Sequence, residues 1–308
     1  MTFLNIIVLY NPNYNYGKNK PNGTSIKNIN LLQQFICLYD SIKKNLKIPH
    51  DIYITHYDDF NEHDMNILKK LQVNFSKVNV SNICDASFER YNIPTKIKGT
   101  HRLICETDML LINNPPFEFE YDFQAGYAGK IMFKKKYIDK LVNYYNLNIS
   151  PEINYKFKNL FYHYNIIKTS YKKLYPHFNN GLILIKEHLS HIFYKYIIDN
   201  KITNTKFLPF IKKTPLYQHI SNQIMVGLIL TNLTNNWKPF KPGINYLFTN
   251  IYEINKFGKD NIYLLHYCGS KSYHIANKCF PKLLNHQYIL NQLCPNSEDN
   301  IKSSDKNP

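Results

Sequence analysis

The sequence has few glycines and no paired cysteines. Glycine accounts for only 10 of the 308 residues, while Asn, Ile, Lys and Tyr dominate, a bias typical of AT-rich coding. The six cysteines form no Cys-x-x-Cys pair and no zinc-ligand cluster, and several lie inside apolar runs. This spacing argues against a disulfide framework and a zinc finger, and it predicts reduced, partly buried thiols.

Long apolar runs are also missing. The first apolar stretch, residues 3–10, is far shorter than the roughly 20 residues that a membrane helix needs. No basic segment or cleavage pattern flanks this stretch, so it lacks the pattern of a secretion signal. We therefore expect a cytoplasmic protein without a membrane span, located in the host cytoplasm or the virion if the gene is viral.

The chain does have enough apolar residues for a full core, and it carries a large excess of positive charge. Apolar residues make up 44% of the sequence, and 38 Lys and Arg residues outnumber 22 Asp and Glu residues. A net charge of +16 suits phosphate-bearing ligands, nucleic acid or an anionic surface, although coding bias toward Lys explains it equally well. We predict a single domain over residues 1–295 and a disordered polar tail over residues 296–308.

The first hundred residues alternate between apolar runs and helical patterns, which is typical of an α/β fold with parallel strands joined by helices. Further on, a Lys- and Tyr-rich segment at about residues 133–175 has helical spacing, and we expect a helical insertion there. The strands expected in the first part lie at residues 3–10, 51–55 and 77–80, and the helices at residues 26–46 and 62–71.

Two carboxylates one residue apart follow the apolar run His101–Cys105. This run is expected to be a buried strand that delivers Glu106 and Asp108 to its C-terminal tip, where ligands bind in an open α/β sheet. Two carboxylates that share a site repel unless a cation lies between them, and their hard oxygens suit Mg²⁺ or Mn²⁺. The alternative interpretation is an ordinary strand end with solvated acids.

A second informative motif lies near the end of the chain, where the apolar run 261–265 leads to His266, Gly269 and Lys271. A neutral imidazole at a strand tip can bind a metal, a glycine lets the backbone approach a phosphate, and a lysine can neutralise one. Alone, the motif is more typical of a structural histidine and a turn. Combined with the two carboxylates, it supplies the parts needed to hold a metal-bound diphosphate.

Two shorter motifs lie between these. Asn179 belongs to a Phe-Asn-Asn-Gly sequence before the apolar run 182–185, a pattern more typical of a turn. Ser221, Asn222 and Gln223 open an apolar helix over residues 224–230, where Ser221 or Asn222 could serve as the N-cap. Neither motif indicates a function by itself, but the order of all four along the chain does.

In this order, the motifs resemble those of family eight of the retaining glycosyltransferases, the glycogenin and lipopolysaccharide galactosyltransferase type, over roughly residues 3–280. The resemblance implies the GT-A fold, a Rossmann-like mixed sheet flanked by helices. It further implies a nucleotide-sugar donor, usually UDP-linked, a divalent cation, usually Mn²⁺, and a hydroxyl acceptor on a glycan or protein. Sugar transfer in this family retains the configuration of the anomeric carbon.

The resemblance also implies roles by position. Glu106, Asp108 and His266 match the three metal ligands, and Gly269 and Lys271 match the loop that closes on the diphosphate. Two departures from the family concern these residues. Glu106 replaces an aspartate, and its side chain, longer by one methylene, could contact the metal indirectly or face the ribose. The spacing from Gly269 to Lys271 is one residue shorter than in the family.

Asn222 and Gln223 fall where the family has an Asp-Gln pair near the reacting sugar, so these two and Lys271 are the implied catalytic residues. Because Asn222 replaces an acid, no carboxylate nucleophile stands at that position, and front-face attack by the acceptor hydroxyl fits better. The implied donor-binding residues, in addition to Gly269 and Lys271, are Leu9, Tyr10, Asn11, Arg90, Lys96, Thr107 and Asn179.

Other interpretations of the sequence stay open. A nucleotidyltransferase would also use an acid pair, but the loop at residues 11–24 lacks the compact Gly-x-Gly arrangement expected of one. A catalytically impaired binding protein with the same fold is favoured by the departures at Glu106 and Asn222. Nucleic acid could follow the basic and aromatic insertion, but no recognition motif supports this partner, and we do not expect it. Asp122 is either a donor- or acceptor-side group or an ordinary loop acid.

Overall fold

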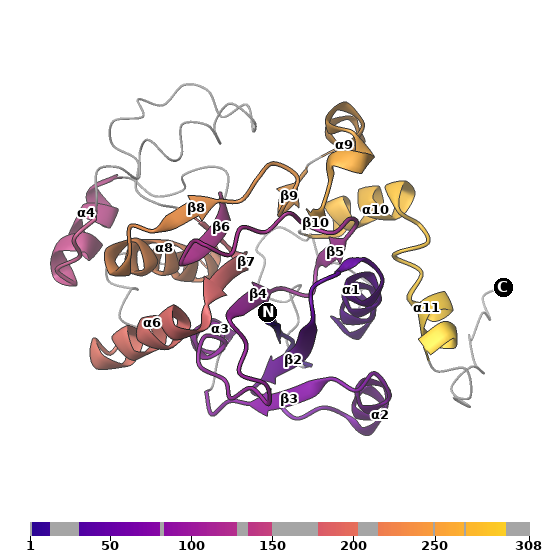
Figure 1. Cartoon of the computed structure of the whole chain (residues 1–308), viewed down its shortest axis with the longest axis horizontal. Helices are drawn as coiled ribbons and strands as arrows, with labels where there is room; N and C mark the ends of the chain where they lie inside the picture. The colour runs from indigo at the N-terminus through magenta and orange to yellow at the C-terminus, as the bar shows by residue number, and fades with distance from the viewer. Residues whose placement is uncertain are drawn as a thin grey trace.

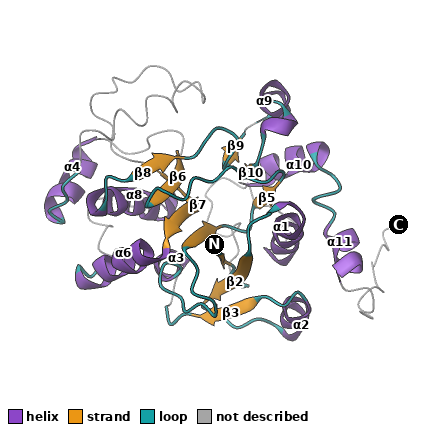
Figure 2. Cartoon of the chain, viewed as in Figure 1, coloured by secondary structure: helices purple, strands orange, loops and turns teal. Residues whose placement is uncertain are grey.

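Helices cover both faces of a seven-stranded central sheet, and a three-stranded sheet lies beside it (Figure 1). The structure is a computed structural model that describes residues 2–12, 31–80, 83–127, 135–149, 178–202, 215–248, 250–267 and 269–293. Figure 2 shows the strands grouped in the centre with the helices around them. The α/β mixed sheet flanked by helices, which the sequence predicts, is therefore confirmed.

The central sheet is mixed because one inner strand runs against its neighbours. Its parallel first part consists of β1 (Leu4–Leu9), β2 (His50–His56), β3 (Asn74–Lys77) and β4 (His101–Cys105). Its second part consists of β7 (Phe178–Lys186), antiparallel to β4, then β6 (Phe123–Tyr127) and the edge strand β8 (Trp237–Pro239). The small sheet contains β5 (Met109–Leu111), β10 (Leu264–His266) and β9 (Tyr246–Leu247).

Alternate residues of β1 face opposite layers of helices. Ile6 and Val8 belong to one buried cluster and Ile7 to the other, because successive side chains of a strand point to opposite faces. The first cluster includes α1 (Leu31–Asn45), α2 (Glu62–Lys70), α9 (Ile251–Phe257), α10 (Gly269–Cys279) and α11 (His286–Leu293). The second includes α3 (Ile83–Glu89), α4 (Lys135–Tyr144), α6 (Glu187–Asp199) and α8 (Pro215–Leu233). Burial on both faces explains why β1 is apolar throughout.

Several elements begin at residues that differ from the sequence-based expectation. The third strand lies at Asn74–Lys77 rather than at residues 77–80. Asn179 lies inside β7, which begins at Phe178, so the Phe-Asn-Asn-Gly sequence is part of a strand and does not form a turn. The helix α8 begins at Pro215, a residue favoured in a first turn, so Asn222 is inside the helix and is not its N-cap.

The strands β6 and β8 have no periodic pattern that predicts them from the sequence. Both are short, and β8 contains a proline, which strands tolerate at a sheet edge. Their pairing depends on a contact between distant residues, because the ring of Phe123 stacks on that of Trp237 with the ring centroids 5.5 Å apart. Local periodicity does not contain this information.

One helix lies in the described part of the Lys- and Tyr-rich segment. That helix is α4 (Lys135–Tyr144). The rest of the predicted insertion, from residue 150 onward, and the tail after residue 293 lie outside the described residues. The predicted division into a single domain, an insertion and a tail stays a prediction.

The described cysteines are buried thiols. Cys37, Cys105 and Cys279 are all free, as the sequence predicts. Burial raises the pKa of Cys37 and of Cys105 to about 12, so both are protonated near neutral pH. This protonation argues against a nucleophilic role for either thiol.

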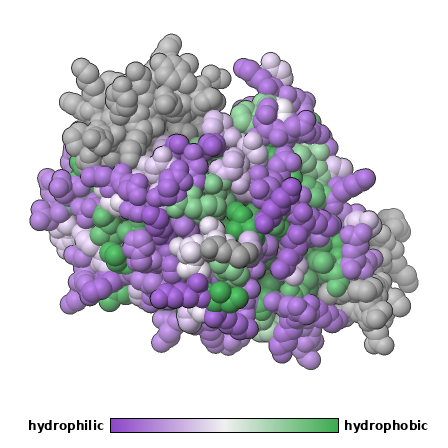
Figure 3. All heavy atoms as spheres, viewed as in Figure 1, coloured by the Kyte–Doolittle hydropathy of each residue, from purple (hydrophilic) through white to green (hydrophobic). Residues whose placement is uncertain are grey.

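The surface of the protein is mainly hydrophilic on the face shown in Figure 3, where hydrophobic residues form only small patches between polar ones. Single exposed apolar side chains, such as Ile97 and Tyr252, are normal on a protein surface. Among the described helices, none combines the length and the apolar composition that crossing a bilayer requires.

Asp122, directly before β6, is held by three hydrogen bonds to its carboxylate. Its carboxylate accepts hydrogen bonds from the Thr234 hydroxyl at 2.6 Å, the Lys186 ammonium at 3.0 Å and the Asn236 amide at 3.1 Å. Burial alone would raise the pKa of Asp122, but these donors outweigh it and lower the pKa below its usual value. These contacts favour the interpretation of Asp122 as a structural acid over a role in binding substrate.

We expect the contribution of Asp122 to stability to depend on pH. Because the pKa is lower in the folded state, this contribution is present above the unfolded pKa of about 3.9 and is lost as pH falls through the folded pKa. Asp122→Asn should lower the free energy of unfolding by about 1–2 kcal/mol at neutral pH and by progressively less as the pH falls below about 3.9. Urea unfolding over this pH range measures the difference.

The control is Asp199→Asn, because the ion pair between Asp199 and Lys195 is exposed and should contribute little. A deficit of Asp122→Asn that is equally large at both ends of the pH range would contradict the prediction.

Candidate metal centre

The two acids lie where β4 ends. The backbone N–H of Glu106 donates to the carbonyl of Gly181 at 3.0 Å, which extends the pairing of β4 with β7 by one residue. The chain then bends, and β5 begins at Met109, directly after Asp108. Both carboxylates face one site, as residues two apart in extended chain do, while the hydroxyl of the intervening Thr107 bonds to Gln34.

Strand β10 brings His266 to the acids. It pairs antiparallel with β5, so that His266 lies opposite Met109. The backbone N–H of Tyr267 also donates to the carbonyl of Asp108 at 3.0 Å. Since β5 follows the acids directly, this short ladder places the imidazole beside them.

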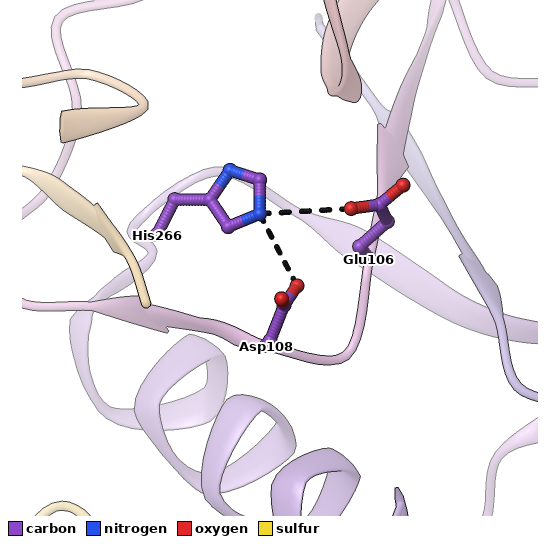
Figure 4. Close-up of side chains that lie close together, drawn as sticks. All are labelled: Glu106, Asp108 and His266. Atoms are coloured by element: carbon purple, nitrogen blue, oxygen red, sulfur yellow. Dashed lines mark ion pairs between the residues drawn. The ribbon is translucent and has the colours of Figure 1, made fainter. Parts of the chain in front are cut away.

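The three side chains form one cluster, as Figure 4 shows. The Nε2 atom of His266 lies 3.2 Å from Oδ1 of Asp108 and 3.6 Å from Oε2 of Glu106. One ligand atom from each residue falls within 4.8 Å of the others, which is a spacing that could hold a metal ion. The side chain of His266 is 1% exposed, that of Asp108 19% and that of Glu106 32%, so the cluster is open on the side of the glutamate.

The cluster fits a divalent cation. Oδ1 of Asp108 is buried and accepts no hydrogen bond in the described part of the chain, although Nε2 of His266 lies 3.2 Å away, and a cation between the two would satisfy both atoms. One imidazole nitrogen and two carboxylates form a ligand set that suits Mn²⁺, and Mg²⁺ accepts the carboxylates. The three residues that the sequence predicts as metal ligands are thus together in space, and metal binding by them stays a prediction.

Gly181 leaves the space in which these side chains meet. A Cβ atom at this position would lie 2.7 Å from Cε1 of His266, 2.7 Å from Oδ1 of Asn179 and 2.8 Å from Oε2 of Glu106. These separations are shorter than real Cβ contacts, so any larger residue would displace the cluster. Gly181 belongs to the Phe-Asn-Asn-Gly sequence, but this sequence alone does not indicate that the glycine is part of the site.

The end of β1 lies beside the strand end that carries the acids. Val8 pairs with Cys105, so Leu9, Tyr10 and Asn11 follow at the same edge of the sheet. The Tyr10 hydroxyl donates to Asp64 at 3.0 Å, and burial together with this carboxylate raises the pKa of Tyr10 above its usual range. Asn11 is also buried, and its Oδ1 accepts from the backbone N–H of Asp58 at 2.9 Å.

Leu9 is only half-buried, so among these three it has the most accessible side chain. Donor binding by Leu9, Tyr10 and Asn11 stays a prediction. The contacts of the two polar residues indicate that they shape the edge of the sheet through protein partners.

Thr107 and Asn179 also lie at the site, and both are buried. The Thr107 hydroxyl donates to Oε1 of Gln34 at 3.1 Å, which ties the turn between the acids to α1. Oδ1 of Asn179 accepts from the backbone N–H of Gly181 at 2.8 Å. Asn179 therefore holds the strand beside the cluster, and its predicted contact with the donor is compatible with this place.

The guanidinium of Arg90 forms hydrogen bonds with backbone carbonyls of the protein. The group is buried and donates to the carbonyls of Ser87 at 3.2 Å, Cys105 at 3.2 Å and Asn180 at 3.4 Å. These bonds hold α3 against the ends of β4 and β7. The predicted donor contact of Arg90 stays a prediction that these contacts do not favour.

Lys96 lies at the other end of the sheet. The backbone of the next residue, Ile97, accepts a hydrogen bond from Asn5, which pairs with Arg102 near the start of β4. At about 3.3 Å per residue, the length of β4 separates this end from Glu106 by roughly 13 Å. Donor binding by Lys96 stays a prediction that this backbone position does not favour.

For Asn222, Gly269 and Lys271, the structure describes the position of the backbone only. Asn222 lies in α8, and Gly269 and Lys271 form the first turn of α10, so the segment predicted to be a loop begins a helix. The side chains of Asn222 and Lys271 lie outside the described part of the structure. Gln223 is half-buried on α8, next to the apolar run that covers β7.

The topology is that of the GT-A fold of glycosyltransferases, which the resemblance in the sequence implies. Among solved structures, the glycosyltransferase GlyE of Streptococcus pneumoniae TIGR4 matches with a TM-score of 0.50 at 13% identity, over 95% of this chain and 63% of its own. At this identity, the likeness shows the fold alone.

Two further solved structures are similar at lower TM-scores. The bifunctional glycosyltransferase WbbM has a TM-score of 0.46 and 11% identity, with 87% of this chain and 46% of that chain covered. The galactosyltransferase LgtC, solved with donor and acceptor sugar analogs, has a TM-score of 0.47 and 12% identity, with 91% and 95% covered. The chain thus spans only part of the length of GlyE and WbbM. No family model matches the sequence, and no curated protein does so either.

Proposed function

We propose that the protein is a metal-dependent glycosyltransferase that moves a sugar from a nucleotide-sugar donor, a UDP-sugar, to a hydroxyl acceptor with retention of configuration. The observation that carries this proposal is the convergence of Glu106, Asp108 and His266 at the carboxyl ends of the central strands. Ligands bind at this edge in open α/β sheets, and a GT-A fold makes a nucleotide sugar the ligand to test first.

Glu106, Asp108 and His266 would hold the cation, which is Mn²⁺ or Mg²⁺. When bound, such a cation stabilises the negative charge that develops on a leaving diphosphate. The first turn of α10, which begins at Gly269 shortly after His266, offers backbone N–H groups suited to a phosphate. Lys271 in the same turn would add a positive charge.

Asn222 and Gln223 on α8 would orient the sugar. Neither side chain is a carboxylate, so neither can serve as the nucleophile of a double displacement. In the proposed reaction, the acceptor oxygen bonds to the anomeric carbon on the face from which the diphosphate leaves. The acceptor proton passes to the departing phosphate oxygen, which balances the exchange.

The first test measures thermal unfolding with UDP in the presence and absence of Mn²⁺. UDP at about 100 times its dissociation constant should stabilise the protein by ~2.7 kcal/mol, which raises the melting temperature by roughly 5 °C. This shift should require the metal. Single-stranded RNA is the comparator, because the net charge of +16 could attract any polyanion.

Two outcomes would count against the proposal. Stabilisation by RNA without any effect of UDP and Mn²⁺ would indicate a basic binding protein. Binding of UDP with Mn²⁺, but no release of UDP from any nucleotide sugar in a screen followed by ³¹P NMR, would indicate a catalytically impaired relative with the same fold.

A further inference from the structure

Asn245 is a buried polar residue in direct contact with His266. Its Oδ1 atom lies 2.9 Å from Nδ1 of the imidazole, and the residue is 2% exposed. No motif in the sequence points to Asn245, and it has no part in the roles that the resemblance implies. The contact is on the side of the ring opposite to Nε2, the atom that faces the carboxylates of Glu106 and Asp108.

The loop that carries Asn245 is fixed to the strand that carries His266. The carbonyl of Gly243 accepts from the backbone N–H groups of Tyr263 at 2.9 Å and Leu264 at 3.0 Å. Directly after Asn245, β9 pairs in parallel with β10. The backbone at Gly243 has a φ of 87°, and a Cβ there would lie 2.0 Å from the carbonyl oxygen of Asn261, so this close approach requires glycine. The position of Asn245 beside the ring is therefore set by the backbone.

The contact determines which ring nitrogen carries the proton. An amide oxygen can only accept a hydrogen bond, so Nδ1 of His266 must be the donor to Oδ1 of Asn245. In the neutral imidazole, Nε2 is then a lone-pair acceptor. This lone pair points toward two carboxylates, and three acceptors converging on one place favour a cation between them.

Asn245 also bears two energetic costs that packing does not explain. Its backbone has a φ of 59°, in the left-handed region, which is unfavourable for most residues other than glycine and is tolerated by asparagine. Its Nδ2 atom is buried without a hydrogen-bond partner among the described residues. Strained or unsatisfied groups of this kind cluster at functional sites, where the surrounding structure holds them in place.

We propose that Asn245 is a positioning residue that holds His266 in the tautomer with the proton on Nδ1 and so presents Nε2 to the divalent cation. This inference rests on the proposed function and extends it to the support of the metal ligand. An outer partner that orients a metal-binding histidine typically accounts for about 10–100-fold in metal affinity.

The test compares two substitutions of Asn245 in the full chain. Asn245→Gly tolerates the left-handed backbone and removes the acceptor oxygen, and Asn245→Asp keeps an oxygen that can accept from Nδ1. The control is Asn146→Gly, which makes the same change at an exposed residue whose φ is also left-handed, 49°. Mn²⁺ affinity is measured by electron paramagnetic resonance of the free ion.

The second readout needs no metal. The tautomer of His266 is determined by ¹H–¹⁵N NMR of metal-free protein labelled at histidine, with the resonance assigned by its absence in His266→Gln. In the wild type, Nδ1 should carry a proton whether or not Nε2 is also protonated, because the amide oxygen of Asn245 accepts its hydrogen bond. In Asn245→Gly, the population of rings with a proton on Nδ1 should fall, and a purely structural role of Asn245 would not change it.

Asn245→Gly should weaken Mn²⁺ binding by about 10–100-fold, while Asn245→Asp should restore it and Asn146→Gly should leave it unchanged. Unchanged Mn²⁺ affinity of Asn245→Gly, or a wild-type tautomer with the proton on Nε2, overturns the inference. If the wild type binds no Mn²⁺, the proposed function fails and the inference with it. That result is distinguishable, because the wild type itself then lacks the affinity that Asn245→Gly was expected to reduce.

Discussion

Asp108→Asn should abolish the Mn²⁺-dependent binding of UDP and leave the fold intact. The substitution keeps the shape of the side chain and removes the negative charge that faces Nε2 of His266 at 3.2 Å. A cation bound by two carboxylates and an imidazole loses one of its charged ligands, and we expect affinity to fall by at least about 100-fold. The measurement is the Mn²⁺-dependent shift in melting temperature with UDP.

The fold should survive this change for an electrostatic reason. In the metal-free protein, the carboxylates of Glu106 and Asp108 share one site and repel each other when both are ionised. Removing one charge relieves this repulsion, so the metal-free variant should melt at the same temperature as the wild type or above it.

Asp260→Asn, a change at an exposed acid on the 3₁₀ turn before β10, is the matched control and should behave as the wild type. Metal-dependent UDP binding that persists in Asp108→Asn would show that the acid pair has another role.

The second large effect is expected from Gly181→Ala. The added Cβ would meet Asn179, Glu106 and His266 at 2.7–2.8 Å, so the carboxylate and the ring must move apart or away from the strand. The backbone at Gly181 lies in a regular strand, and the substitution therefore acts through contacts and not through backbone strain. We expect Mn²⁺ affinity to fall by at least about 100-fold and stability by about 1–3 kcal/mol.

Gly99→Ala is the control that separates the two effects. A Cβ at Gly99 would lie 2.6 Å from Nδ2 of Asn5 and 3.0 Å from the carbonyl oxygen of Phe3, at the opposite end of the sheet from the acids. This variant should lose a similar amount of stability and keep the Mn²⁺ affinity of the wild type. Urea unfolding and metal titration of both variants test the comparison, and equal losses of affinity would refute it.

The parts of the fold that the sequence predicts are those with a local cause. The apolar runs of β1, β2 and β4 and the amphipathic pattern of α2 fall at the expected residues, because the periodicity of a strand or helix depends on a few neighbouring positions. The strands β6 and β8 lack such a pattern. They pair with strands distant in the chain, where the Phe123 and Trp237 rings also stack, and no window of sequence contains these contacts.

In the candidate site, too, some residues can be predicted from local sequence and others depend on tertiary packing. The place of Glu106 and Asp108 at a strand end follows from the apolar run before them, whereas the contacts of Arg90 and the distant place of Lys96 depend on how loops pack against the sheet. Asn245 could not be identified from the sequence, because an asparagine after Pro-Gly-Ile in an asparagine-rich chain gives no signal. Its role appears only when the loop lies against β10.

The sequence by itself thus determined the α/β class and the delivery of two acids and a histidine to strand ends, since both depend on local periodicity. Only the tertiary structure decided that these ends meet. The pairing of β5 with β10 joins segments distant in the chain, Gly181 leaves the space in which they converge, and Asn245 holds the imidazole from behind. These three features depend on hydrogen bonds and close packing between residues that are far apart in the chain. The local pattern of the sequence does not show which distant residues come into contact.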